Sequence, residues 1–259
     1  MNWIERLGSW CIFYLERLGN QFAFFFRIVF WIFKPPFLLG EVFKQIHFIG
    51  VRSMVVILLT GGFTGMVLGM QGFYTLSKFG ALGFLGSMVS LSIIKELGPV
   101  LSALMVTGRA GSAIAAEIGI MRISEQLDAL DTMALHPIKY IVVPKVIAAL
   151  ICVPLLTAVF DVIGIIGGYA TGVNLLGASA GSYISSMETH VQWQDVHEGL
   201  IKSISFAVII SAVCCFEGYY TDAYSGQGAE GVGHATTTAV VISSVMILVW
   251  DYFITSVLI

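Results

Sequence analysis

Charged residues are what this sequence has least of. Only 11% of its 259 residues are Asp, Glu, Lys or Arg, whereas 57% are hydrophobic and the mean hydropathy is +0.90. Soluble domains average about 25% charged residues. The deficit predicts a chain that lies largely within a lipid bilayer. The formal net charge of −3 also argues against general binding to nucleic acid.

The chain also lacks the motifs by which a protein performs chemistry on its own. It has no G-x-x-x-x-G-K-[ST] loop for nucleotide phosphates and no H-E-x-x-H pair for zinc. Ser112 does not lie in a G-x-S-x-G turn, and no base accompanies it. The cysteines lack disulfide or metal spacing, and we expect small buried core residues at Cys11, Cys152, Cys214 and Cys215. We therefore predict a protein that is not an enzyme and binds no metal or cofactor itself.

The N-terminal region predicts a helix at the membrane surface rather than a signal peptide. Its first 20 residues carry Glu5, Arg6, Glu16 and Arg17, and no small-residue cleavage site follows. Apolar residues recur at helical spacing, which predicts an amphipathic helix over residues 1–21 on the membrane or on a neighbouring helix. The aromatic run 22–33 has only 12 residues, too few to cross roughly 30 Å of hydrocarbon. We expect an interfacial elbow or a re-entrant segment there.

Five later segments are apolar and long enough to cross a bilayer, which predicts an all-α, polytopic membrane protein. They cover residues 54–71, 81–108, 141–169, 200–216 and 235–259. A single domain spans residues 1–259, with the interfacial helix and elbow in 1–50 and the five-span core in 51–259. Residues 172–198 are polar enough to leave the membrane, and 217–234 have the composition of a glycine-rich loop.

Two local features predict how the spans are shaped. Gly61, Gly65 and Gly69 are spaced four residues apart, which favours close packing of the first span against another helix. In the second span, Gly98-Pro99 predicts a kink, because proline removes one backbone donor and clashes with the preceding turn.

The basic residues predict the orientation of the spans. Six of the thirteen Lys and Arg residues precede the first span, four lie within or shortly after the stretch 108–137, and none lies in 172–200. By the positive-inside rule, the N-terminus and 108–137 face the cytoplasm and 172–198 face outward. Five spans then put the C-terminus outside. The 217–234 segment would be cytoplasmic, although it contains no Lys or Arg.

Residues 108–137, which we call the hinge, interrupt the apolar spans with six charges: Arg109, Glu117, Arg122, Glu125, Asp128 and Asp131. Within the hinge, apolar residues recur at helical spacing and acidic residues cover the remainder, up to Pro137. This pattern predicts a short cytoplasmic helix over about 122–137 that docks on a partner protein. A helix lying on lipid and a plain loop are the alternatives, but the acidic face would be repelled by anionic lipid.

Four charges fall inside the predicted spans: Lys95, Glu96, Lys202 and Asp251. Each costs about 2.5–3.5 kcal/mol on insertion scales. They either pair internally and fix helix packing or line a polar path for a charged headgroup, and both roles are compatible. Lys202 and Asp251 could instead lie near the outer interface and extend toward it. Adjacent Lys95 and Glu96 point about 100° apart on a helix, so we expect them to use different partner faces.

The block LSIIKELGPVLSALMVTGRAGSAIAAEIGIMRISEQLDALDTMALHPIKYIVVPKVIA, residues 91–148, resembles the MlaE family, the Mla-type permeases of the ABC system that moves phospholipids across the Gram-negative envelope. The likeness extends to GMVLGMQG before it and to LIKS and HATTTAVVISS after it. It implies a multi-pass, homodimeric inner-membrane protein with its N-terminus in the cytoplasm. The implied partners are cytoplasmic ABC ATPase subunits that bind ATP and Mg, a small STAS-domain subunit, a periplasmic MCE-domain hexamer, and phospholipid.

The resemblance also implies roles for particular residues. The central polar stretch corresponds to the helix that couples the permease to its ATPase, with contacts expected at Glu125, Leu127, Asp128, Asp131 and Met133. The family's intramembrane charges match Lys95, Glu96, Lys202 and Asp251. A lipid cavity at the dimer interface, lined by the first and last spans, would include Leu68, Met70, Tyr74 and Leu76. The competing hypothesis is an ion- or proton-coupled secondary carrier that uses Glu96 and Asp251 itself.

Overall fold

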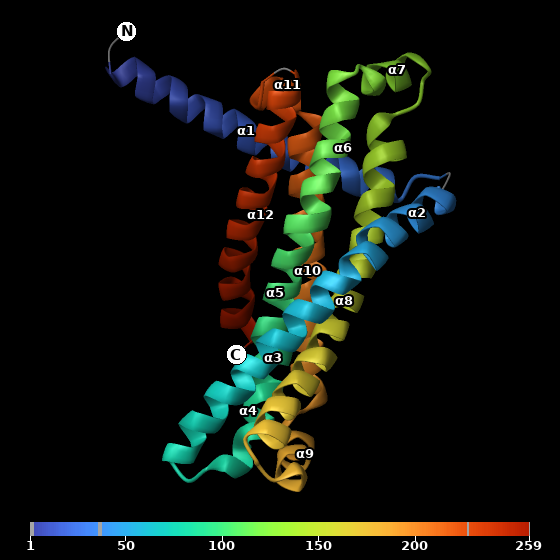
Figure 1. Ribbon diagram of the computed structural model, residues 1–259. Helices are drawn as coiled ribbons and strands as arrows, with labels where there is room; N and C mark the ends of the chain where they lie inside the picture. Colours follow the sequence, from blue (N-terminus) through green and yellow to red (C-terminus); the bar gives the residue numbers. More distant parts are fainter. Residues whose placement is uncertain (1–2, 36–37, 227, 259) are drawn as a thin grey trace.

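Five long apolar helical segments form a bundle, as the hydropathy pattern predicts (Figure 1). The computed structural model describes residues 3–35, 38–226 and 228–258. Within these, the segments that are long and apolar enough to cross a membrane are Leu39–Lys78, Leu82–Ile123, Ile138–Leu175, Trp193–Tyr219 and Gly228–Val257. The chain is thus an all-helical, multi-pass membrane protein.

Several of these segments are composites of shorter helical pieces. The first joins α2 (Leu39–Ile49), the 3-10 turn η1 (Val51–Ser53) and α3 (Met54–Lys78). The second runs through η2 (Leu82–Phe84), α4 (Leu85–Ser92), η3 (Ile93–Leu97), α5 (Gly98–Val106), η4 (Thr107–Gly111) and α6 (Ser112–Ile123). The third joins η5 (Ile138–Val142), α8 (Val143–Tyr169) and η6 (Ala170–Leu175). The fourth and fifth are single helices, α10 (Trp193–Tyr219) and α12 (Gly228–Leu258).

Shorter elements lie at the two ends of the bundle (Figure 1). At one end are α7 (Gln126–Thr132), α11 (Thr221–Tyr224) and the long N-terminal helix α1 (Trp3–Ile32), which crosses the bundle obliquely. At the other end are the α3–α4 connection and α9 (Ala180–His190). The hinge and the 217–234 segment therefore share an end, and residues 180–190 lie at the opposite end.

The predicted glycine packing is confirmed, and its partner is the third span. A Cβ on Gly65 would lie 1.8 Å from the carbonyl oxygen of Gly164, and one on Gly69 would lie 2.7 Å from that of Gly168. Because glycine has no Cβ at these positions, the backbones of α3 and α8 touch. This contact leaves much of the opposite face of α3 exposed.

Burial is uneven among the spans. The helix α10 is the most buried, while α12 and the α2–α3 segment are the least. The described free cysteines, Cys152, Cys214 and Cys215, are buried as predicted, whereas the side chain of Cys11 lies outside the described part. Most of the predicted apolar stripe over residues 1–21 also falls on side chains outside that part, although Trp3, Leu15 and Leu18 are exposed.

Several predicted boundaries were wrong. Residues 22–33 are not a separate elbow, because α1 continues without a helix breaker as far as Ile32. The predicted loop over 217–234 is mostly helical: α10, α11 and α12 cover most of its described residues, and Gly226 and Gly228 adopt positive φ where α12 begins. Residues 180–190 and 193–198 are also helical, and 193–198 begin α10 and so belong to the fourth long apolar segment.

Four of the described helical turns have π geometry, in which each backbone N–H bonds five residues back: η3, η4, η5 and η6. The first directly precedes Gly98-Pro99, so the predicted distortion at this dipeptide takes the form of a π-turn. Lys95 and Glu96 lie in η3, Arg109 in η4 and Lys139 in η5. Turns of this kind are common at functional sites, and here three of the four carry charges within the long apolar segments.

Candidate functional site

The hinge contains one short, exposed helix that is set apart from the spans. Glu125, before α7, has φ 57°, and Ala134, after it, has φ 58°. Both residues adopt the left-handed conformation that ends helical runs. The N–H of Leu135 returns to the carbonyl of Leu130 at 2.9 Å, which closes α7 in a Schellman-type cap. The predicted coupling helix of about 122–137 is therefore shorter than expected and covers Gln126–Thr132.

Arg122 fixes α7 to the rest of the bundle. Its Nη1 lies 2.9 Å from Asp128 of α7, and its Nε lies 3.0 Å from Asp222 of α11. One guanidinium thus joins the end of the second span to both short helices. Asp128 keeps 58% of its side-chain surface exposed, so a partner protein can still reach it.

The five predicted coupling residues divide into two groups. Glu125, Asp128, Asp131 and Met133 are exposed and form an acidic surface around one large apolar side chain. Leu127 is only 1% exposed, because the apolar stripe of α7 faces this protein's own core. The expectation that Leu127 contacts a partner is therefore wrong for this conformation, in which it anchors α7.

A second cluster joins three spans through Lys202. Its Nζ lies 2.7 Å from Glu96 Oε2 and 3.2 Å from Asp251 Oδ1, and it donates to the carbonyl oxygen of Lys95 at 3.0 Å. The Lys202 side chain is only 2% exposed, whereas that of Glu96 is 43% exposed. Lys202 therefore points into the bundle rather than toward an interface, and it binds both acids on which the carrier hypothesis depends.

Lys95 belongs to a neighbouring cluster at the start of α10. Its Nζ lies 3.1 Å from Asp195 and 3.0 Å from Glu198. Residues 195, 198 and 202 fall on one face of α10. The expectation that Lys95 and Glu96 use different partner faces was wrong. Both side chains reach the same face of α10, but Lys95 binds acids near its start and Glu96 binds Lys202 further along the helix.

The predicted cavity residues on α3 do not share one face. Met70 and Tyr74 are exposed, together with Phe63 and Met66 on the same side of the helix. Leu68 and Leu76 are half-buried and pack against the core. A hollow of about 300 Å³ lies between α3 and α5, lined by Leu59, Thr60, Phe63, Thr64, Leu101 and Met105. The exposed face and this hollow form one continuous apolar surface on α3.

Three further charged contacts were also missed by sequence reasoning. Arg17 binds Glu217 at 2.7 Å, Lys145 binds Glu117 at 2.6 Å, and Arg109 donates to the backbone carbonyl of Phe48. The only indication of these contacts in the sequence was an acidic or basic residue at the edge of an apolar run. The partner could not be found from it, because these pairs lie 28 to 200 residues apart.

Comparisons with known proteins place the chain beside a family of permeases. The family model described as Permease MlaE matches residues 42–257, which include all of the hinge and nearly all of the five spans. A probable ABC transporter permease protein of Rickettsia felis is 44% identical over 98% of this chain and 97% of its own length. The intermembrane phospholipid transport system permease protein MlaE of Haemophilus influenzae is 40% identical over 100% of this chain and 98% of its own length. A chloroplast protein of Arabidopsis thaliana, TRIGALACTOSYLDIACYLGLYCEROL 1, is 34% identical over 89% of this chain and 65% of its own length.

Proposed function

The chain belongs to the MlaE family of ABC transporter permeases, and on this basis we propose that it moves phospholipid between the inner membrane and a periplasmic carrier. In a Gram-negative cell this transport would maintain the lipid asymmetry of the outer membrane. The observation that carries the proposal is full-length similarity to a phospholipid-transport permease of H. influenzae. The chain itself is the non-catalytic membrane component.

A permease of this class needs an ATPase partner, and α7 is the surface that fits one best. The chain has no phosphate-binding loop, so ATP and Mg would be bound on the partner. We assign the contact to Glu125, Asp128, Asp131 and Met133, which are exposed around α7. The bond from Arg122 to Asp128 would transmit movement of α7 to the second span and α11.

The lipid cavity would form between two copies of the chain. The exposed apolar faces of α3 and α12 are free to pack against a second copy, which would present the same surface by two-fold symmetry. Met70 and Tyr74 would then face the lipid tails beside the hollow at Phe63. Leu68 and Leu76 would support this wall from behind. Lys95, Glu96, Lys202 and Asp251 would hold the spans together and provide polar groups along the lipid path.

The complete assembly would include a small STAS-domain subunit in the cytoplasm and an MCE-domain hexamer in the periplasm. The charge distribution favours a cytoplasmic N-terminus and hinge. The α9 end, opposite α7, would then face the periplasmic hexamer (Figure 1).

Reconstitution with the ATPase tests the proposal. Purified complex in liposomes should move a fluorescent phospholipid only when ATP and Mg are supplied. The double variant Asp131→Arg with Met133→Arg should lose the ATPase on co-purification. The matched control, Ile184→Arg with Glu188→Arg on exposed positions of α9, should retain it. Flux without ATP would overturn the transporter class, and an ATPase that stays bound to the α7 variant would overturn the docking surface.

A further inference from the structure

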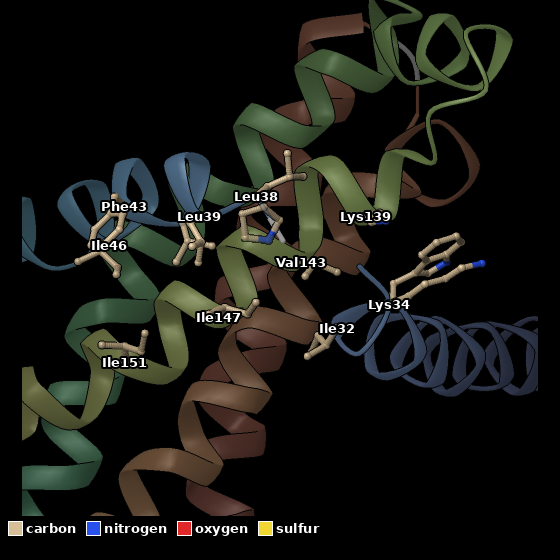
Figure 2. Close-up of a pocket in the computed structure, with 13 residues that line it drawn as sticks. Ile32, Lys34, Leu38, Leu39, Phe43, Ile46, Lys139, Val143, Ile147 and Ile151 are labelled. Carbon is tan, nitrogen blue, oxygen red and sulfur yellow. The ribbon is translucent and has the colours of Figure 1, made fainter. Parts of the chain in front are cut away.

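A narrow apolar groove lies on the outer side of α8, away from its glycine contact with α3. It is formed where the end of α1 and the helix α2 meet α8, and its volume is about 230 Å³ (Figure 2). Its walls include Leu39, Phe43 and Ile46 from one side and Val143, Ile147 and Ile151 from the other. Pockets for whole ligands typically have about 300–1,000 Å³, so this groove is sized for a single hydrocarbon chain.

One end of the groove is cationic. Lys34 Nζ lies 4.8 Å from the centroid of the Trp31 ring, and Lys139 Nζ lies 5.5 Å from the same centroid. Lys139 is 9% exposed and donates to the carbonyl oxygen of Pro35 at 2.7 Å. None of the 13 lining residues is acidic. Two lysines thus converge on one tryptophan without a carboxylate in the lining to neutralise them.

The length of the groove corresponds to one leaflet of a bilayer. From Lys139 in η5 to Ile151 in α8 is 12 residues along the third span, or about 18 Å at the α-helical rise of 1.5 Å per residue. Half of a roughly 30 Å hydrocarbon core is about 15 Å. With Trp31 and the two lysines at one end, the groove has the layout of a lipid site in one leaflet, because tryptophan and basic side chains gather at membrane interfaces. The rest of the groove extends to the depth of the acyl chains.

We propose that this groove binds one anionic phospholipid from the surrounding bilayer. The phosphate lies against Lys34 and Lys139, and one acyl chain follows Phe43, Ile147 and Ile151. A lipid bound there adds a bridge between the end of α1 and the η5–α8 segment, next to the existing contacts of Trp31 with His136 and Lys139. This site is separate from the transport surface on α3, and its occupancy does not depend on transport.

The test measures lipid that stays with the purified protein. The full chain is placed in nanodiscs of mixed phosphatidylglycerol and phosphatidylcholine, and retained lipid is quantified by native mass spectrometry. An anionic surface contributes about 1 kcal/mol per basic residue, or about fivefold each, so two lysines give a preference of roughly 25-fold for phosphatidylglycerol. The double variant Lys34→Gln with Lys139→Gln should abolish this preference. Lys44→Gln, an exposed lysine of α2 that pairs with Glu41 outside the groove, should preserve it.

A second variant keeps both lysines and fills the groove. Ile147→Trp should release the bound lipid, whereas Val162→Trp, on an exposed position of the same helix, should not. Equal retention of the two lipids, or retention unchanged in Ile147→Trp, would mean that only ordinary boundary lipid is present and would overturn the proposal. Loss of the lipid in Met70→Trp on α3 would assign it to the transport surface and would contradict a separate site.

Discussion

Arg17 and Glu217 join the N-terminal helix to the fourth span. Nη2 of Arg17 lies 2.7 Å from both carboxylate oxygens of Glu217, whose side chain is 1% exposed. Below this pair, the ring of Phe24 packs edge-on against that of Phe216, with centroids 5.8 Å apart. A helix that only rested on the membrane surface would need neither contact. The helix α1 is therefore part of the packed bundle.

Removing Arg17 should loosen this junction. In Arg17→Ala, the Glu217 carboxylate stays buried without its partner, which costs up to about 3 kcal/mol. We expect a lower thermal unfolding midpoint in detergent. Glu217→Gln in the same chain should restore most of the loss, because no buried charge remains. Arg27→Ala, an exposed arginine on the same helix, is the control, and an equal loss there would show that the ion pair has no special role.

Gly65 should be among the least replaceable residues of α3. In Gly65→Ala, the new Cβ meets the backbone of Gly164 rather than a flexible side chain, so the two helices must separate. We expect a cost of at least about 1–3 kcal/mol, measured as a lower unfolding midpoint. Gly62→Ala is a matched control three residues away, since its Cβ would lie 3.5 Å from Ile163 in ordinary contact. Similar midpoints for the two variants would contradict the backbone contact.

Features that depend on the spacing of nearby residues could be predicted from the sequence. The five spans follow from runs of apolar residues, and the contact at Gly61, Gly65 and Gly69 follows from their four-residue spacing. The exposure of the acidic residues around α7 likewise follows from the cost of placing them in hydrocarbon. In each case, the property that decides the outcome can be read from the residues of one helix.

Features that depend on long-range neighbours could not be predicted. Glycine composition suggested a loop where α12 begins, but Gly231 fits in the helix because its missing Cβ leaves room for the Gly226 carbonyl. The apolar stripe on α7 showed that Leu127 would be covered, without showing whether this chain or a partner covers it. Glu96 and Asp251 could be assigned as the partners of Lys202 only once the arrangement of the three spans was known.

Leu127 should control the position of α7. Leu127→Ala removes a fully buried side chain, and such changes cost about 2–5 kcal/mol in packed cores. We expect faster amide hydrogen exchange across residues 124–137 and weaker coupling of ATP hydrolysis to lipid movement. Met133→Ala, at a 61% exposed position beside α7, should leave the exchange unchanged. Exchange that is equally fast in both variants would contradict an anchoring role for Leu127.

Lys202 should be needed for folding before it is needed for transport, because its amine neutralises the carboxylates of two acids. In Lys202→Met, Glu96 and Asp251 lose the amine that binds them at 2.7 and 3.2 Å. We expect a marked loss of stable protein in the membrane. The triple variant Lys202→Met, Glu96→Gln and Asp251→Asn removes all three charges and should recover a folded bundle, measured by its unfolding midpoint.

The same triple variant separates packing from transport. Glu96 keeps 43% of its side-chain surface exposed although it is paired, which leaves it accessible to a lipid headgroup. We expect ATP-driven phospholipid flux in liposomes to fall at least tenfold in the folded triple variant. Lys95→Met is the comparison, because it removes the cation of the neighbouring cluster at Asp195 and Glu198 and leaves the three charges of the Lys202 cluster in place. A triple variant that folds and retains full flux would limit these charges to holding the three spans together.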